Sequence, residues 1–118
     1  MTQIFWLKCQ GEVWCKLHGV NLEHPHFQGM TGVVVIWHGA PNPHTVQVAT
    51  GIVSEVIAAA RQNPAINLYR ANGLFVTWAG RPASQQMSIA AYLSARLTPL
   101  VPQPQLNWMP QVEVNLPW

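Results

Sequence analysis

The run of residues 33–37, Val-Val-Val-Ile-Trp, is the feature that most restricts what this chain can fold into. β-Branched and aromatic side chains favour the extended backbone, and no polar residue alternates with them to mark a solvent-facing side. A strand of this kind needs hydrogen-bonding neighbours along its edges and packed layers over its faces. We therefore expect residues 33–37 to form a central strand that is covered on both faces.

Shorter apolar segments predict the partners of this strand. Residues 45–48 follow a glycine- and proline-rich turn and predict a returning strand, and residues 73–79 predict a third core strand. Residues 4–9 and 13–17 are apolar and are separated by Gln-Gly-Glu, which predicts a β-hairpin. Residues 112–115 are expected to add an edge strand after a stretch that is too rich in proline for regular structure.

Two further segments have helical spacing. Residues 52–62 repeat apolar side chains along one helical face and end at Asn63-Pro64, and a second helix is expected between Ser84 and Pro99. Each amphipathic helix needs a layer to pack against. The sequence therefore predicts an α+β fold, a three-stranded antiparallel sheet with packed helices, plus an N-terminal β-hairpin and a proline-rich C-terminal tail.

The length of 118 residues suits one domain and is too short for two cores. Within it we expect an N-terminal hairpin and loop at 1–30, a core at 31–101 and a tail at 102–118. No apolar run approaches the roughly 18 residues that cross a bilayer. Lys8 follows the first apolar stretch instead of preceding it, unlike the charge of a signal peptide. These observations predict a soluble, cytoplasmic protein that does not enter a membrane.

Charge is unusually scarce, because only 8% of the residues are charged and none is Asp. Ordinary soluble domains have about a quarter. With a net charge of only +2, little repulsion opposes the association of like chains, so we expect a homo-oligomer or a complex with a protein partner. The alternative is a merely neutral surface of amide and hydroxyl side chains.

Nucleic-acid binding is expected to be weak, because the basic residues form no cluster along the chain. The six tryptophans include two in the proline-rich tail, Trp108 and Trp118, which either clamp the tail onto the sheet or anchor a partner. The dispersed basic residues are Lys8, Lys16, Arg61, Arg70, Arg81 and Arg96.

Cys9 and Cys15 are followed by His18, His24 and His26, which raises the possibility of a zinc site. Structural zinc sites usually begin with two cysteines two to four residues apart, and here five residues separate them. In the predicted hairpin neither cysteine lies opposite the other, which disfavours a disulfide. We expect two buried thiols, no metal and no cofactor.

The segment Gly-Val-Val-Val-Ile-Trp-His-Gly at 32–39, followed by Val-Gln-Val-Ala at 46–49 and an amphipathic helix, resembles the GIY-YIG nuclease family. The resemblance extends over about 31–101, and the ending at 114–118 resembles the tails of small bacterial members. It implies a nuclease site in which two tyrosines, an arginine of the first helix and a glutamate of the second surround one divalent metal. The carboxylate would anchor the cation and the arginine would neutralise the phosphate.

Carried over by position, the tyrosines fall on Val34 and Gln47, the arginine on Val56 and the glutamate on Ala90, or on Ala91 in a shifted register. The terminal glycine of the second motif falls on Ala49. None of these side chains can supply the family's chemistry, so the resemblance implies a degenerate member without catalytic residues.

Two more predictions concern the surface. Apolar residues at the degenerate positions would turn a wet cleft into a dry patch, so we expect an interface that includes Val56, Ala59 or Ala90. His38 and His44 flank the turn between the motif strands and are candidates for a polar cleft, although no carboxylate lies near them in sequence. The expected function is a self-assembling or partner-docking pseudoenzyme; the alternatives are a weak nucleic-acid-binding module and a divergent nuclease.

Overall fold

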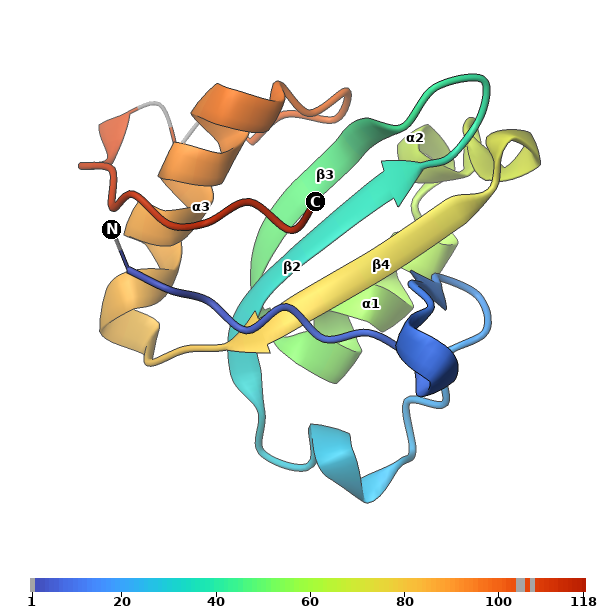
Figure 1. Ribbon diagram of the computed structural model, residues 1–118, viewed down its shortest axis with the longest axis horizontal. Coiled ribbons are helices and arrows are strands. Elements are labelled where there is room, and N and C mark those ends of the chain that lie inside the picture. Colours follow the sequence, from blue (N-terminus) through green and yellow to red (C-terminus); the bar gives the residue numbers. More distant parts are fainter. Residues whose placement is uncertain (1, 104–105, 107) are drawn as a thin grey trace.

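The computed structural model describes residues 2–103, 106 and 108–118. Over these residues the fold is α+β, with one antiparallel sheet of four strands in the order β1-β4-β2-β3 (Figure 1). The strands are β1 (Cys15–Lys16), β2 (Thr31–His38), β3 (His44–Ile52) and β4 (Leu74–Gly80). The α-helices are α1 (Val53–Gln62), α2 (Pro64–Asn67) and α3 (Ala83–Leu97), and the short 3-10 helices are η1 (Gln10–Glu12), η2 (Pro25–Phe27) and η3 (Arg70–Asn72).

The central position predicted for residues 33–37 is confirmed. Strand β2 pairs with β3 on one edge and with β4 on the other, and Val34 lies between Ala49 and Trp78. All five side chains of the run are buried. The two helices predicted around the sheet are also present as α1 and α3.

The sheet separates two hydrophobic layers. On one face α3, the N-terminal segment and the C-terminal tail pack on Val33, Val35 and Trp37. On the opposite face α1, α2 and residues 17–27 pack on Val34 and Ile36. Figure 1 shows the two terminal segments crossing one face of the sheet, with α1 behind the other. Side chains of consecutive β2 residues therefore enter different layers, as the alternation of a strand requires.

The predicted N-terminal hairpin is wrong. Residues 4–9 form no strand, and the N–H of Leu7 donates to the carbonyl of Trp78 while the Thr77 hydroxyl donates to the carbonyl of Leu7. Only β1 enters the sheet, by pairing with β4, which gives a fourth strand instead of the predicted three. The intervening residues form η1, where positive φ angles at Gly11 and Glu12 turn the chain away from hairpin geometry.

The cysteines were also predicted wrongly, because Cys9 and Cys15 form a disulfide and neither is a free thiol. The prediction assumed a hairpin register that would hold the cysteines apart. In the observed η1 turn their Cα atoms lie 5.1 Å apart, within the usual range for a disulfide.

The C-terminal tail packs on the sheet without forming the expected edge strand. Its only bridge within the described residues is a parallel one between Thr2 and Val114. Asn115 accepts a hydrogen bond from the Ile4 N–H and donates one to the Ile4 carbonyl. Trp118 clamps the end of the tail, since its ring lies 4.6 Å from that of Trp37, whereas Trp108 is 89% exposed. None of the described helices is long and apolar enough to span a membrane.

Candidate functional site

The four positions carried over from the nuclease family do not come together. Val34 packs in the α1 layer, Val56 borders that layer, and Gln47 is paired with Ile36 of the same layer. Ala90 lies in the α3 layer on the other face of the sheet, and so does Ala91. In either register the sheet stands between the glutamate position and the other three, so these positions cannot surround one metal ion.

The same placement corrects the predicted interface. Ala90 is completely buried within the chain, so it cannot contact a partner of the folded protein. Val56 is half-buried and Ala59 is exposed on the outer side of α1. These two residues remain available as a small apolar surface.

His38 and His44 lie opposite each other in the β2–β3 ladder, with ring centroids 6.2 Å apart, and Tyr69 stacks on His38 at 5.6 Å. His38 is buried and its Nδ1 has no hydrogen-bond partner among the described residues. Nε2 of His44 lies 3.0 Å from the carbonyl oxygen of Thr98. The two histidines and Tyr69 thus form a packed aromatic stack.

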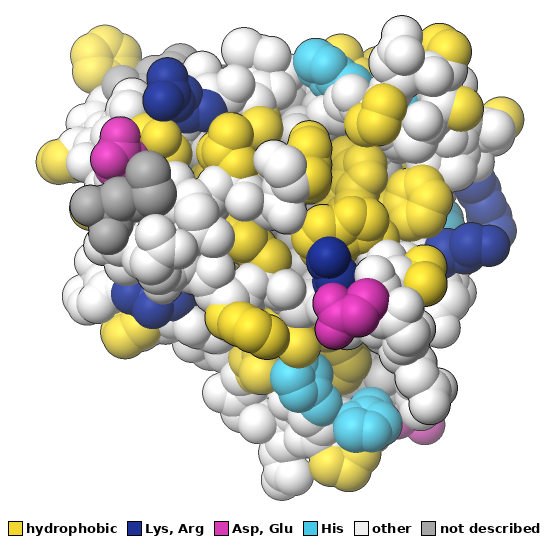
Figure 2. All heavy atoms as spheres, in the orientation of Figure 1, with side chains coloured by type: hydrophobic (Ala, Val, Ile, Leu, Met, Phe, Trp, Pro, Cys, Tyr) yellow, Lys and Arg dark blue, Asp and Glu magenta, His cyan; other side chains and the backbone are white. Residues whose placement is uncertain are grey.

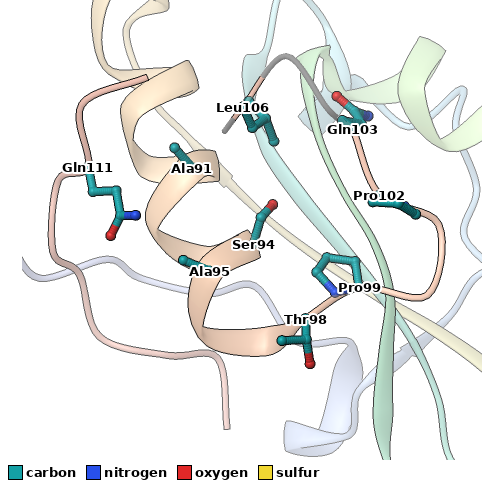
Figure 3. A pocket seen from close by; sticks show the side chains of 9 residues that line it. All are labelled: Ala91, Ser94, Ala95, Thr98, Pro99, Pro102, Gln103, Leu106 and Gln111. Carbon is teal, nitrogen blue, oxygen red and sulfur yellow. The ribbon is translucent and has the colours of Figure 1, made fainter. Parts of the chain in front are cut away.

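A pocket of about 280 Å³ lies between α3 and the chain that follows it (Figure 3). The helix supplies Ala91, Ser94 and Ala95, and the chain beyond it contributes prolines, Gln103 and Gln111. No lining residue is ionisable. This pocket offers shape and neutral hydrogen-bonding groups, but no acid, base or nucleophile of adjusted reactivity.

Four aromatic side chains form one cluster that reaches the surface, here called the aromatic face: Trp14, Trp37, Phe75 and Trp118. The rings of Trp14, Phe75 and Trp118 lie 5.2, 5.7 and 4.6 Å from the Trp37 ring. Trp37 is buried at the centre, Trp14 and Phe75 are half-buried, and Trp118 is 45% exposed. Three elements distant in sequence therefore place their rings around one buried tryptophan.

Charged side chains surround the aromatic face. The ammonium of Lys8 lies 4.7 Å from the centre of the Trp14 ring, and Lys16 is paired with Phe75 across the β1–β4 ladder. Arg96 and Trp118 line one small pocket. Figure 2 shows hydrophobic side chains gathered at the centre of this side of the molecule, with a basic and an acidic side chain next to each other at the edge of the patch.

A second group of cations lies near the loop after β1. Arg61 donates hydrogen bonds to the carbonyls of Leu17 and Val20, so it holds that loop in place. Burial lowers the pKa of His18 below its ordinary value, and the nearby charges of Arg70 and Arg61 lower it further. The fold thus brings together basic residues that are dispersed in the sequence.

Comparison with protein-family models, curated proteins and solved structures finds no match to this chain. Among the described residues no three potential ligands from His, Cys, Asp and Glu are placed to hold a metal ion. The aromatic face is a defined cluster of rings contributed by segments far apart in the sequence. Its sequence signal was the number of tryptophans, but no local pattern indicated that Trp14, Trp37 and Trp118 would meet.

Proposed function

We propose that this protein is a non-catalytic docking subunit that binds a second copy of itself through the aromatic face. The observation that carries the proposal is the exposed Trp118 ring packed on the buried Trp37 ring. An aromatic side chain held in place by its own fold loses little conformational entropy when a partner covers it.

Clustered aromatic side chains favour this face over the outer side of α1. Tryptophan is enriched among the residues that contribute most to binding in protein interfaces, and those residues cluster at the centre of the buried area. Trp118, Trp14 and Phe75 surround one centre in this way. The outer side of α1 offers only the half-buried Val56 and small side chains such as Ala59.

A second copy is a suitable partner for two reasons. The net charge of +2 opposes self-association only weakly. Side chains of both signs lie at the edge of the hydrophobic patch in Figure 2, so two copies related by a twofold axis can place opposite charges across the interface. In a twofold interface both copies use the same face, so no second binding surface is needed on the molecule.

The proposal includes a family origin. The β2 motif between Gly32 and Gly39 and the β3 segment after it support descent from a GIY-YIG-like nuclease. The aliphatic and amide side chains at Val34, Gln47, Val56 and Ala90 support loss of its activity. In this view the protein is a cytoplasmic pseudoenzyme whose remaining role is assembly.

Size-exclusion chromatography with light scattering tests the assembly. The unmodified chain is expected at about twice 13.1 kDa at micromolar concentration. Trp118→Ser should give a monomer because it removes the most exposed ring of the aromatic face. Lys16→Glu, on the rim beside Phe75, leaves the aromatic core intact and should weaken the dimer by changing the charge pattern.

Ala59→Arg is the matched control, since it places a charge on the exposed side of α1 and should leave the dimer intact. If Ala59→Arg dissociates the assembly and Trp118→Ser does not, the interface lies on α1 as the sequence predicted. A monomeric unmodified chain contradicts self-association through either face.

A second candidate function is binding of single-stranded nucleic acid. The observation that favours it is the position of Lys8 over Trp14 and of Lys16 beside Phe75. Single-strand-binding proteins combine stacking aromatic rings with cations that follow the phosphates. We rank it second because the cations at this face are few.

A further inference from the structure

We propose that the Cys9–Cys15 disulfide is a reversible thiol-exchange site at which a small anionic thiol of the glutathione class attacks the sulfur of Cys9. The inference concerns the pocket beside the disulfide and does not depend on the proposed docking function. It rests on the burial of the two cysteines, the backbone between them and the side chains of that pocket.

The two cysteines are unequally exposed. Cys9 is an exposed residue, whereas Cys15 in β1 is 2% exposed and packs in the α1 layer. An incoming thiolate therefore reaches Cys9 more readily than Cys15. Accessibility of one sulfur is a property of exchangeable disulfides, since exchange begins with attack along the axis of the bond.

The loop that the disulfide closes is short, and its backbone conformation at Glu12 is unfavourable. The cysteines are six positions apart, so the bond restricts the unfolded chain less than a bond across a long loop does. Between them Glu12 has a φ of 61°, which is unfavourable for a residue other than glycine. Reduction releases this turn, which favours the dithiol form.

The fold does not depend on this bond to hold the flanking chain. Leu7 is hydrogen-bonded to Trp78 and Thr77 on one side of the loop, and β1 is paired with β4 on the other. Opening the disulfide frees residues between two fixed points, so the rest of the domain is expected to remain folded.

A pocket of about 540 Å³ lies beside the bond and is lined by both cysteines. Lys8, His24 and His26 also line it, and no carboxylate does. Nδ1 of His24 accepts the His26 N–H, and Nε2 of His26 accepts the indole N–H of Trp78, so each neutral imidazole has its other nitrogen left to donate. These donors and the side chain of Lys8, whose ammonium lies 4.7 Å from the centre of the Trp14 ring, suit a small thiol that carries carboxylates.

In the exchange, the incoming thiolate forms a bond to Sγ of Cys9 and the Cys9–Cys15 bond breaks. The electron pair leaves on Sγ of Cys15, which lines the same pocket, and that thiolate then takes up a proton. A second molecule of thiol attacks the mixed disulfide and releases Cys9. In total, two thiols are oxidised to their disulfide and the protein is reduced to a dithiol, so atoms and electrons balance.

This reaction also reconciles the bond with the cytoplasmic location proposed above. The cytoplasm keeps most protein thiols reduced, and disulfides found there are usually transient or redox-sensing. An exchangeable bond is the kind that such a compartment permits.

The test is equilibration of the folded, unmodified chain in glutathione buffers of varied reduced-to-oxidised ratio, followed by alkylation and mass spectrometry. The bond is expected to change between oxidised and reduced within the range of cellular ratios, with the far-ultraviolet circular dichroism unchanged. A bond that stays oxidised at every ratio, or that opens only when the domain unfolds, overturns the proposal.

Two single-cysteine variants test the site of attack. With oxidised glutathione, Cys15→Ser should acquire one glutathione at Cys9 at least about ten-fold faster than Cys9→Ser does at the buried Cys15. Equal rates contradict attack at Cys9. Lys8→Glu, which retains both cysteines, should slow reduction by glutathione but not by uncharged 2-mercaptoethanol, and equal slowing or no slowing of both contradicts the anionic ligand.

Discussion

His18 shows how single residues of this fold respond to their neighbours. Its pKa lies below the ordinary value of 6.5, first because of burial and then because of the positive charges of Arg70 and Arg61. The folded state therefore binds a proton on His18 less readily than the unfolded chain does. The contribution of His18 to the free energy of unfolding is fully present above about pH 6.5. It declines as the pH falls toward the lower, folded-state pKa.

Arg70→Gln should reduce this dependence, because it removes one of the two positive charges that hold the pKa of His18 down. A nuclear magnetic resonance titration of the imidazole is expected to give a higher pKa in the variant than in the unmodified chain. Urea unfolding between about pH 8 and pH 5 should show a shallower loss of stability. His18→Gln is the control that abolishes the contribution, and an unchanged pKa of His18 in Arg70→Gln contradicts the electrostatic cause.

Residue-level predictions from the sequence succeeded where local pattern decides the outcome. Burial of residues 33–37 follows from their side chains alone. The disulfide was missed because it depends on a positive φ at Glu12, which no propensity of glutamate indicates. Likewise, nothing near Ala90 in sequence shows on which face of the sheet it lies.

At the scale of elements, the pairing of β2 with β4 depends on a residue without a side chain. Gly32 is paired with Gly80, and a Cβ on Gly32 would lie 2.0 Å from the carbonyl oxygen of Ala79. Backbone atoms cannot move aside by a rotamer change, so the two strands would have to separate there. The strand predicted from 33–37 thus requires glycine at position 32, where its pairing with β4 begins.

Gly32→Ala is expected to lower the free energy of unfolding by about 3 kcal/mol or more, since the clash is with backbone. Urea unfolding followed by tryptophan fluorescence measures the change. The matched control is Gly19→Ala, where an added Cβ would have its nearest neighbours at 3.6 Å or beyond, and a change within about 0.5 kcal/mol is expected. Similar losses in both variants contradict the close approach of β2 and β4.

Helices and strands were predicted best where the apolar spacing repeats over many residues. Helices α1 and α3 and strand β3 follow from repeated apolar spacing. Residues 4–9 are apolar too, yet they bond to β4 through a few contacts instead of pairing with residues 13–17. Which segment pairs with which is a tertiary choice, and short apolar runs carry little information about it.

At the scale of the whole molecule, the fold concentrates some of the positive charge that the sequence disperses. Lys8 and Lys16 flank the aromatic face, and Arg96 lines a pocket with Trp118. Three cations suffice for weak contacts with phosphates, and the exposed Trp118 ring offers stacking to an unpaired base. The composition could set an upper limit on such contacts, but only the fold shows which cations share a face.

We therefore expect weak, salt-sensitive binding of single-stranded oligonucleotides and little binding of duplexes, whose bases are not free to stack. With two or three phosphate contacts, affinity should fall about ten-fold between about 50 and 200 mM salt, and Lys16→Gln should reduce the slope. Fluorescence anisotropy measures both. Arg81→Gln is the control, because Arg81 follows the end of β4 remote from Phe75 and its side chain is hydrogen-bonded to Gln85. Submicromolar binding that persists at about 150 mM salt would contradict this ranking and favour nucleic acid over a second copy as the partner of the aromatic face.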